Sequence, residues 1–224
     1  MTDLSDLSDV VPGETLRAWE QIAAVTPPDG ILMGGTALAV HLRHRVSRDL
    51  DIFTTSPFDS KKLEDQLRSR GQFATTLIDD HSLNGLFEGT KVQFLVAEGQ
   101  TVLAAPTPVG GLNVGSLQDI LATKVKVIGD RAELRDYFDL LEIERRTEHT
   151  VDEGLILYLE RFGVPPTHAS IHHIIVGFGY FDDLGGDPYL EAQHGSSLRD
   201  EVVDYWRRRQ PGIVANFDAY VSET

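Results

Sequence analysis

The stretch ILMGGTALAVHLRHRVSRDLDIF, residues 31–53, sets the architecture that we expect for this chain. It predicts a strand over Ile31–Met33, a turn at Gly34 and Gly35, a helix over about Thr36–Arg43, and a second strand over about Asp49–Phe53. The two glycines allow the backbone to approach another group closely, because neither has a Cβ atom.

Two aspartates of this stretch are candidates for a metal site. Asp49 and Asp51 are two positions apart, so on a strand their side chains leave from the same face, whereas Leu50 and Ile52 point to the other face and into a core. Two carboxylates on one face repel each other unless a cation lies between them, and Mg²⁺ prefers oxygen ligands and substrate phosphates. The alternative is an ordinary β–α–β corner with two solvated aspartates.

The pattern GG-T-A-L, followed by R-x-S-x-D-L-D-x-F, resembles the nucleotidyltransferase family that includes the AbiEii/AbiGii and MenT toxins of bacterial toxin–antitoxin pairs. Residues 124–140, KVKVIGDRAELRDYFDL, resemble a second signature of that family, in which a lysine precedes arginines and R-D-x-x-D-L. The two signatures occur in the order that the family shows.

The second signature contains two further candidates, Lys124 and Asp139. Lys124 falls on the apolar side of a predicted helix, four after Ile120 and four before Ile128, and a lone buried ammonium is costly. Lys124 therefore either reaches the surface past its neighbours or projects into a cleft to meet phosphate. Arg135 and Asp139 are four apart, so a surface ion pair is the plain alternative for Asp139.

The resemblance implies an α+β fold, a minimal nucleotidyltransferase (polymerase-β-like) mixed sheet flanked by helices, with a helical C-terminal part. It implies that Asp49 and Asp51 hold Mg²⁺, that Lys124 grips the triphosphate of a nucleoside triphosphate, and that Asp139 orients the acceptor or takes its proton. A helix that begins at Thr36 directly after Gly34 and Gly35 is suited to phosphate through its backbone N–H groups, and Ser47 could donate a hydrogen bond from the same side.

One position departs from the usual pattern of nucleotidyltransferases. Many of them carry a third carboxylate on a following strand, which here is Thr90–Val96, and the candidate position holds Gln93. An amide accepts a hydrogen bond but supplies no charge, so we expect one metal ion rather than two, with Asp139 substituting in part.

The resemblance implies a type IV-like toxin that transfers nucleotides from CTP or another triphosphate, a pyrimidine being favoured, to the 3′ end of tRNA. A nucleoside triphosphate, tRNA and a cognate antitoxin are the expected partners. The acceptor could instead be a hydroxyl group of a protein, Ser47 of this chain included, or of a small molecule. A non-enzymatic binding protein with a degenerate nucleotidyltransferase fold is the other class of hypothesis.

Composition limits the remaining possibilities. The 224 residues include no cysteine, which excludes disulfides, zinc–thiolate sites and cysteine nucleophiles. The net charge of −15 argues against a general nucleic-acid binder, although basic residues gather around the acidic motif: Arg43, His44, Arg45 and Arg48. An acidic N-terminus and the lack of a long apolar run predict a cytoplasmic protein without a membrane span.

We expect a nucleotidyltransferase core over residues 1–112 and a helical part over 113–224. Residues 1–12 look frayed, and 97–115 read as a loop or an edge hairpin. The other predicted elements are strands over 73–78, 86–87 and 90–96 and helices over about 12–25, 60–70, 116–128, 131–146 and 198–209, with Gly129 and Pro211 among the helix ends. Asp130 with Glu133 could cap the helix over 131–146, and Thr150 with Glu153 forms a capping box for a further helix that Gly163 ends. His168 and His172 could share a helix face as metal ligands, but ordinary polar contacts are the commoner outcome.

Overall fold

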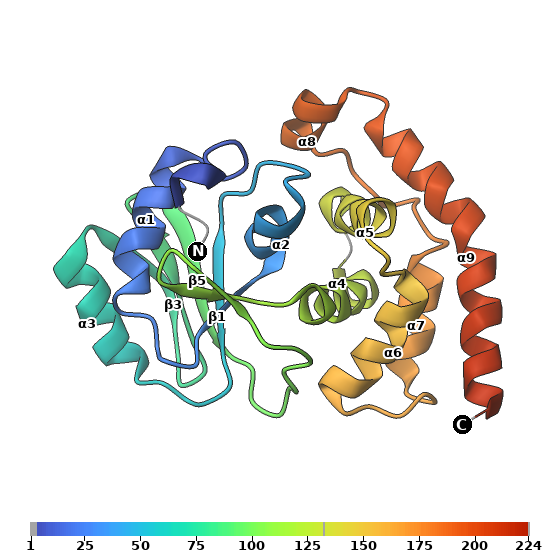
Figure 1. Ribbon diagram of the computed structural model, residues 1–224, viewed down its shortest axis with the longest axis horizontal. Coiled ribbons are helices and arrows are strands. Elements are labelled where there is room, and N and C mark those ends of the chain that lie inside the picture. The colour runs from blue at the N-terminus through green and yellow to red at the C-terminus, as the bar shows by residue number, and fades with distance from the viewer. Residues whose placement is uncertain (1–3, 132, 224) are drawn as a thin grey trace. The chain divides into compact units, whose positions relative to one another are not determined.

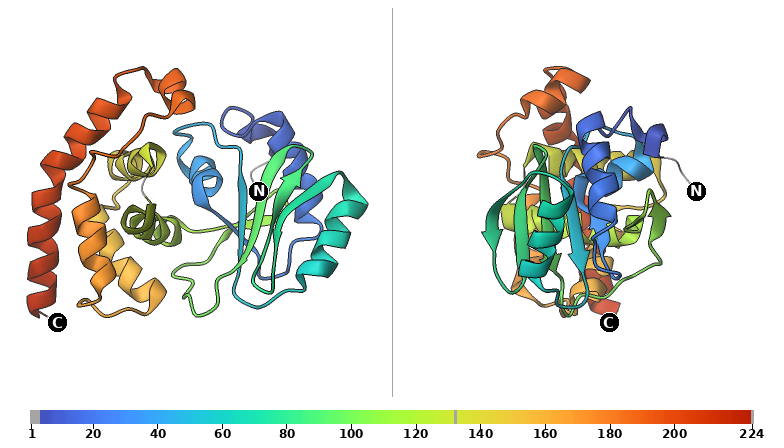
Figure 2. Two further views of the ribbon diagram at one scale, coloured as in Figure 1. Left: turned by 180° about the vertical axis from the view of Figure 1, so that it is seen from behind. Right: turned by 90° about the vertical axis from the view of Figure 1, so that its left-hand side faces the viewer.

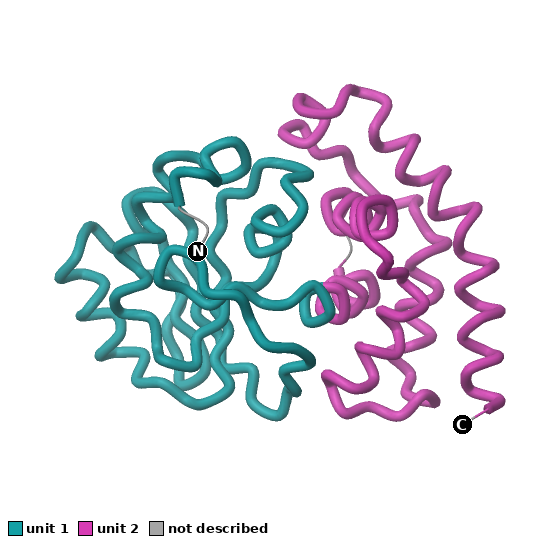
Figure 3. The backbone as a smooth tube through the Cα atoms, viewed as in Figure 1, with its two compact units in different colours: residues 1–120 teal, residues 121–224 magenta. Residues whose placement is uncertain are grey.

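The computed structural model describes residues 4–131 and 133–223. The chain divides into two compact units, residues 1–120 and 121–224 (Figure 3). The first unit contains a sheet with helices, and the second is helical (Figure 1). This is the mixed α+β architecture that the sequence predicts.

Seven strands of the described residues form one mixed sheet in the order β3-β4-β5-β2-β1-β7-β6. Strands β2 and β5 are parallel, as are β1 and β7, and the other neighbours are antiparallel. The strands are β1 (Ile31–Met33), β2 (Leu50–Thr54), β3 (Phe73–Ile78), β4 (Ser82–Phe87), β5 (Thr90–Val96), β6 (Thr107–Val109) and β7 (Leu112–Val114).

One face of this sheet is covered by helices. Helix α1 (Gly13–Ala23) and helix α3 (Ser60–Arg70) lie side by side on it (Figures 1 and 2), and α3 contacts β3 and β4. The side chains that reach this face are buried, with Leu50, Ile52 and Phe94 all 0% exposed. Because side chains alternate along a strand, Asp51 and Gln93 point to the other face.

The N-terminal half of the chain differs from the sequence prediction at two places. Residues Leu4–Leu7 form a short 3-10 helix, η1, and Leu7, Val10 and Val11 are buried, so the described part of residues 1–12 is not frayed. Strand β4 begins at Ser82, because pairing with β3 and β5 draws Asn84 and Gly85 into the sheet despite their weak strand propensity. The edge hairpin expected within 97–115 is confirmed as β6 and β7.

The second unit consists of helices, and α4 begins in the first unit. They are α4 (Leu117–Arg131), α5 (Leu134–Arg146), α6 (Val151–Phe162), α7 (Ala169–Gly177), α8 (Pro188–His194) and α9 (Leu198–Glu223). Helix α9 packs against α5, α6, α7 and α8, and the fully buried Trp206 anchors it by donating a hydrogen bond to the carbonyl of Tyr137 at 3.0 Å.

Two predicted helix ends in this unit are wrong. Helix α4 continues through Gly129 to Arg131, and α9 continues through Pro211 to Glu223. The cap of α5 is Glu133 with Asp136, rather than Asp130 with Glu133. By contrast, Thr150 caps α6 and Gly163 ends it with φ 61°, as the sequence predicts.

None of the helices in the described residues combines the length and the apolar character that a membrane crossing requires.

Candidate active site

The glycine pair lies where strand β1 passes into helix α2 (Gly34–Leu42), so this helix begins two residues earlier than its sequence predicts. Gly34 has φ +71°, and a Cβ atom on it would collide with Oδ2 of Asp51. A Cβ atom on Gly35 would lie 2.5 Å from a terminal nitrogen of Arg45 and 3.2 Å from Oγ of Ser47. The absence of both side chains therefore admits a carboxylate and a guanidinium group to the first turn of α2.

The two aspartates lie on the sheet face opposite to α1 and α3. Asp51 is paired with Met33 on β1 and with Gln93 on β5. Asp49 directly precedes β2; its side chain is 41% exposed, and its Oδ2 lies 4.0 Å from Nζ of Lys91. The expectation that Asp49 and Asp51 share one face therefore agrees with the strand register.

The neighbouring positions on β5 and β4 hold amides. Gln93 is level with Asp51, and Asn84 on β4 is level with Gln93. The position at which many nucleotidyltransferases carry a third carboxylate is thus occupied by an amide. Among residues 4–131 and 133–223, no group of three or more His, Cys, Asp or Glu side chains is arranged to hold a metal ion.

Thr36 and Ser47 fix the segment that leads into Asp49. The hydroxyl oxygens of Thr36 and Ser47 are 2.9 Å apart, and the Thr36 hydroxyl also donates to the carbonyl of Asp49. The Ser47 backbone N–H donates to the carbonyl of Val10 at 2.8 Å. Ser47 is only 7% exposed, so its observed contacts hold the loop rather than face solvent.

Arg45 is a candidate that the sequence pattern counts only as one member of a basic cluster. Its side chain is buried, and its guanidinium group lies against Gly35 at the start of α2. Arg45 is the arginine of the R-x-S-x-D pattern, which is the one feature of the sequence that distinguishes it. Only the fold shows that Arg45, rather than Arg43 or Arg48, approaches the glycine pair.

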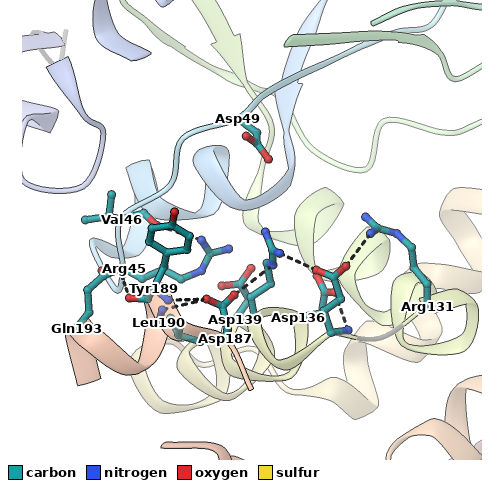
Figure 4. A network of polar contacts seen from close by, with 12 residues as sticks. Arg45, Val46, Asp49, Arg131, Asp136, Asp139, Asp187, Tyr189, Leu190 and Gln193 are labelled. Atoms are coloured by element: carbon teal, nitrogen blue, oxygen red, sulfur yellow. Dashed lines mark hydrogen bonds and ion pairs between the residues drawn. The ribbon is translucent and has the colours of Figure 1, made fainter. Parts of the chain in front are cut away.

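Lys124 and Asp139 come together in the second unit. Nζ of Lys124 on α4 lies 2.6 Å from Oδ2 of Asp139 and donates a hydrogen bond to Oδ1 of Asp136 at 2.8 Å; both aspartates are on α5. Asp136 and Asp139 are labelled in Figure 4 beside Arg131 and Asp187, among the residues of a neighbouring network of polar contacts. The side chains are 8% exposed for Lys124, 8% for Asp136 and 0% for Asp139.

These contacts exclude the surface alternative for both residues. Lys124 points inward and does not reach the surface past its neighbours. Asp139 is not part of a surface ion pair, because it is fully buried, and Arg135 instead pairs with Glu133 at 2.9 Å and Asp187 at 3.5 Å. The Lys124 ammonium is matched by two carboxylates, of which Asp136 also accepts from the Glu133 backbone N–H at 3.2 Å.

The two histidines do not form a metal site. His168 precedes α7 and caps it, whereas His172 is within α7, so they do not share a helix face. Nδ1 of His168 lies 2.7 Å from the Ser170 hydroxyl, which is an ordinary polar contact.

A glycine-led helix beside two carboxylates on one face of a mixed sheet defines the nucleotidyltransferase class of fold. A crystal structure of a Helicobacter pylori protein assigned as a nucleotidyltransferase shares this fold, with a TM-score of 0.54 and 16% sequence identity over 92% of this chain and 95% of that chain. The structure of MenT4, a nucleotidyltransferase toxin of Mycobacterium tuberculosis, aligns with a TM-score of 0.47 and 15% identity over 98% of this chain and 99% of that chain.

The sequence comparisons name the family. Residues 20–101 match the family described as nucleotidyl transferase AbiEii toxin, type IV toxin–antitoxin system. This matched segment is similar to the AbiEii nucleotidyltransferase toxins and contains Gly34, Gly35, Asp49 and Asp51; the protein is a nucleotidyltransferase. An uncharacterized protein of Aquifex aeolicus is 25% identical over 192 residues, which cover 84% of this chain and 89% of that protein.

Proposed function

We propose that this nucleotidyltransferase is the toxin of a type IV-like toxin–antitoxin pair and transfers a nucleotide from a nucleoside triphosphate, CTP or another pyrimidine triphosphate in the first place, to the 3′ end of tRNA. The observation that carries the proposal is the Asp49–Asp51 pair beside Gly34 and Gly35, within the segment that matches the AbiEii family. A cognate antitoxin is the expected partner.

Asp49 and Asp51 would hold Mg²⁺. The donor set suits this ion, because both groups are carboxylates on one strand face and Gly34 leaves room for the Asp51 oxygen. When bound, Mg²⁺ supplies positive charge that offsets the charge on the phosphates and on the leaving pyrophosphate. Gln93 adds no third negative charge. The aspartate pair therefore balances less positive charge than a site with three carboxylates, and we expect it to hold fewer metal ions.

We propose the remaining roles as follows. The backbone N–H groups at the start of α2, from Gly34 to Thr36, would bind phosphate, and the helix dipole favours an anion there. Ser47 and Thr36 hold the loop before Asp49 in place. We assign Lys124 to the triphosphate as a point charge; Asp139 would hold this ammonium in position through the ion pair.

In the transfer step, a hydroxyl oxygen of the acceptor forms a bond to the α-phosphorus of the triphosphate. The bond between that phosphorus and the oxygen that bridges to the β-phosphate breaks, and pyrophosphate leaves with the electron pair. The hydroxyl proton passes to water. Chain groups therefore contribute by positioning and by electrostatics rather than by a covalent intermediate.

The test is incubation of the protein with Mg²⁺, total tRNA and each α-³²P-labelled nucleoside triphosphate in turn. We expect label on tRNA with one or two nucleotides, and at least a ~100-fold loss of label in Asp51→Asn, which keeps the side-chain shape but removes the charge. Asp65→Asn on the exposed side of α3 is the matched control and should label tRNA like the wild type.

The outcomes separate the acceptors and the classes of protein. Label on the protein alone would replace tRNA by a protein hydroxyl as the acceptor. Equal label in the wild type and in Asp51→Asn would contradict the assigned site. No label with any triphosphate, together with no Mg²⁺-dependent nucleotide binding by calorimetry, would favour a degenerate fold that serves as a binding protein.

A further inference from the structure

Strand β5 presents a lysine beside the Asp49–Asp51 pair. Leu50 on β2 is level with Val92 on β5, so Asp49 lies at the level of Lys91, one position earlier on each strand. The parallel register thus places Lys91 beside Asp49 and Gln93 beside Asp51, on the same sheet face. Nζ of Lys91 lies 4.0 Å from Oδ2 of Asp49.

The lysine is free to turn toward the aspartates. Lys91 is level with Leu86 on β4, which is 43% exposed, and the Lys91 side chain itself is 53% exposed. Helices α1 and α3 cover the other face of the sheet, which Leu50 and Val92 reach. A flexible four-carbon chain rooted there can bring its ammonium to either oxygen of Asp49.

The charges of this group are those of a site for one divalent cation. Asp49 and Asp51 carry two negative charges, Lys91 carries one positive charge, and Gln93 carries none. Before a nucleotide binds, one divalent cation leaves a net charge of about +1 on these protein groups, whereas two would leave about +3, with Lys91 repelling the second ion at close range. Where other nucleotidyltransferases add a carboxylate, β5 of this chain supplies an amide and a cation.

We infer that Lys91 is a positioning residue that occupies the electrostatic place of a second metal ion: it holds the Asp49 carboxylate and restricts the aspartate pair to a single divalent cation. This inference rests on the proposed metal site at Asp49 and Asp51. An isolated exposed ion pair contributes little to stability, so the role of Lys91 lies in the charge of the site rather than in the fold.

The test counts Mn²⁺ ions by electron paramagnetic resonance of free Mn²⁺, using the full-length protein and the non-hydrolysable analogue α,β-methylene-CTP. We expect the complex of the wild type with the nucleotide to contain one Mn²⁺. Lys91→Gln should bind Mn²⁺ about five- to tenfold more tightly, or take up a second ion, because the repelling charge is gone. Gln93→Glu should likewise take up a second ion.

The rate of nucleotide transfer should change in the opposite direction to the Mn²⁺ affinity. In Lys91→Gln we expect transfer to be about tenfold slower while Mn²⁺ binding becomes tighter, and a merely structural lysine would not produce that combination. Lys62→Gln is the matched control: it makes the same charge change on α3, which covers the other face of the sheet, and should leave Mn²⁺ affinity and transfer as in the wild type.

Two results would overturn the inference: a wild type that binds two ions, or a Lys91→Gln variant whose Mn²⁺ affinity and stoichiometry equal those of Lys62→Gln. Asp51→Asn distinguishes this failure from failure of the proposed site. If Asp51→Asn abolishes Mn²⁺ binding while Lys91→Gln changes nothing, only the role of Lys91 falls. If Asp51→Asn binds Mn²⁺ like the wild type, the metal site itself is misassigned.

Discussion

Gly34 meets two demands that no other residue type satisfies together. Its φ of +71° is in the left-handed region, and the space that a Cβ would fill is taken by the Asp51 carboxylate. Gly34→Ala should therefore destabilise the protein by about 1–2 kcal/mol and displace Asp51, with transfer activity falling about 100-fold. Urea unfolding and the labelling assay measure the two effects.

The turn between β4 and β5 offers the control for that prediction. Gly89 has φ +85°, and a Cβ on it would meet nothing within 4 Å. Gly89→Ala thus carries similar backbone strain without a collision and should lose stability but keep transfer activity. Equal activity in the two variants would show that Asp51 does not depend on the space beside Gly34.

The buried charge cluster in the second unit makes a separate prediction. Lys124→Met leaves Asp136 and Asp139 buried without their cation, and we expect a loss of about 3–5 kcal/mol in the free energy of unfolding. Adding Asp136→Asn and Asp139→Asn to Lys124→Met should recover part of this loss. Lys126→Met removes an exposed pair with Asp130 and should change stability by less than about 0.5 kcal/mol.

The residues of the site were predictable to different degrees. Helical spacing alone places Lys124 on the apolar side of α4, and strand alternation alone places Asp49 and Asp51 on one face. Neither kind of pattern could show that Asp136 joins Asp139 on Lys124, because that contact depends on how α4 and α5 pack. For Lys91, the sequence likewise predicted only which face of β5 it occupies. Its position beside Asp49 depends on the parallel register of β5 with β2.

At the scale of elements, a single hydroxyl ties α5 to the end of α7. The hydroxyl of the buried Tyr137 donates to the carbonyl of Gly177 at 2.6 Å. Tyr137→Phe leaves that carbonyl without this donor, and we expect the free energy of unfolding to fall by about 1 kcal/mol at neutral pH. Tyr189→Phe, at a side chain that is 68% exposed, is the control and should have little effect.

The same hydroxyl makes the effect depend on pH. Burial raises the pKa of Tyr137 above its usual 10.0, and the neighbouring Asp136 carboxylate raises this pKa further. Above pH 10 the unfolded chain loses the phenol proton while the folded chain keeps it, so the stabilisation is complete below pH 10 and declines as the pH rises. The difference between wild type and Tyr137→Phe should be smaller at pH 10.5 than at pH 7.5.

Helix ends were the least predictable elements. Pro211 lacks a backbone N–H and usually ends a helix, at a cost of about 3 kcal/mol when it lies inside one. In α9 the turns beyond it bury Ile213 at 0% and Phe217 at 7% exposure, and this burial outweighs the cost. Elements with local signals, such as the Thr150 cap and Gly163 end of α6, agree with the sequence because those signals need no tertiary partner.

At the scale of the whole molecule, each compact unit has a core of its own and one of the two tryptophans. Trp19 in the first unit and Trp206 in the second are both fully buried; Trp19 donates to the carbonyl of Gly110 at 3.1 Å. The variant Trp206→Phe therefore keeps Trp19 as the fluorescent reporter of the first unit. The variant Trp19→Phe keeps Trp206 as the reporter of the second unit.

These reporters test whether the units unfold separately. Leu155→Ala empties a fully buried position on α6 and should cost about 2–5 kcal/mol. With a urea dependence of about 2 kcal/mol per molar, the midpoint reported by Trp206 should fall by about 1–2.5 M, while the midpoint reported by Trp19 stays unchanged. Leu38→Ala, at a fully buried position on α2, should do the reverse. If either substitution moved both midpoints together, the two units would be one cooperative structure, and Lys124→Met would then lower the midpoint reported by Trp19 as well.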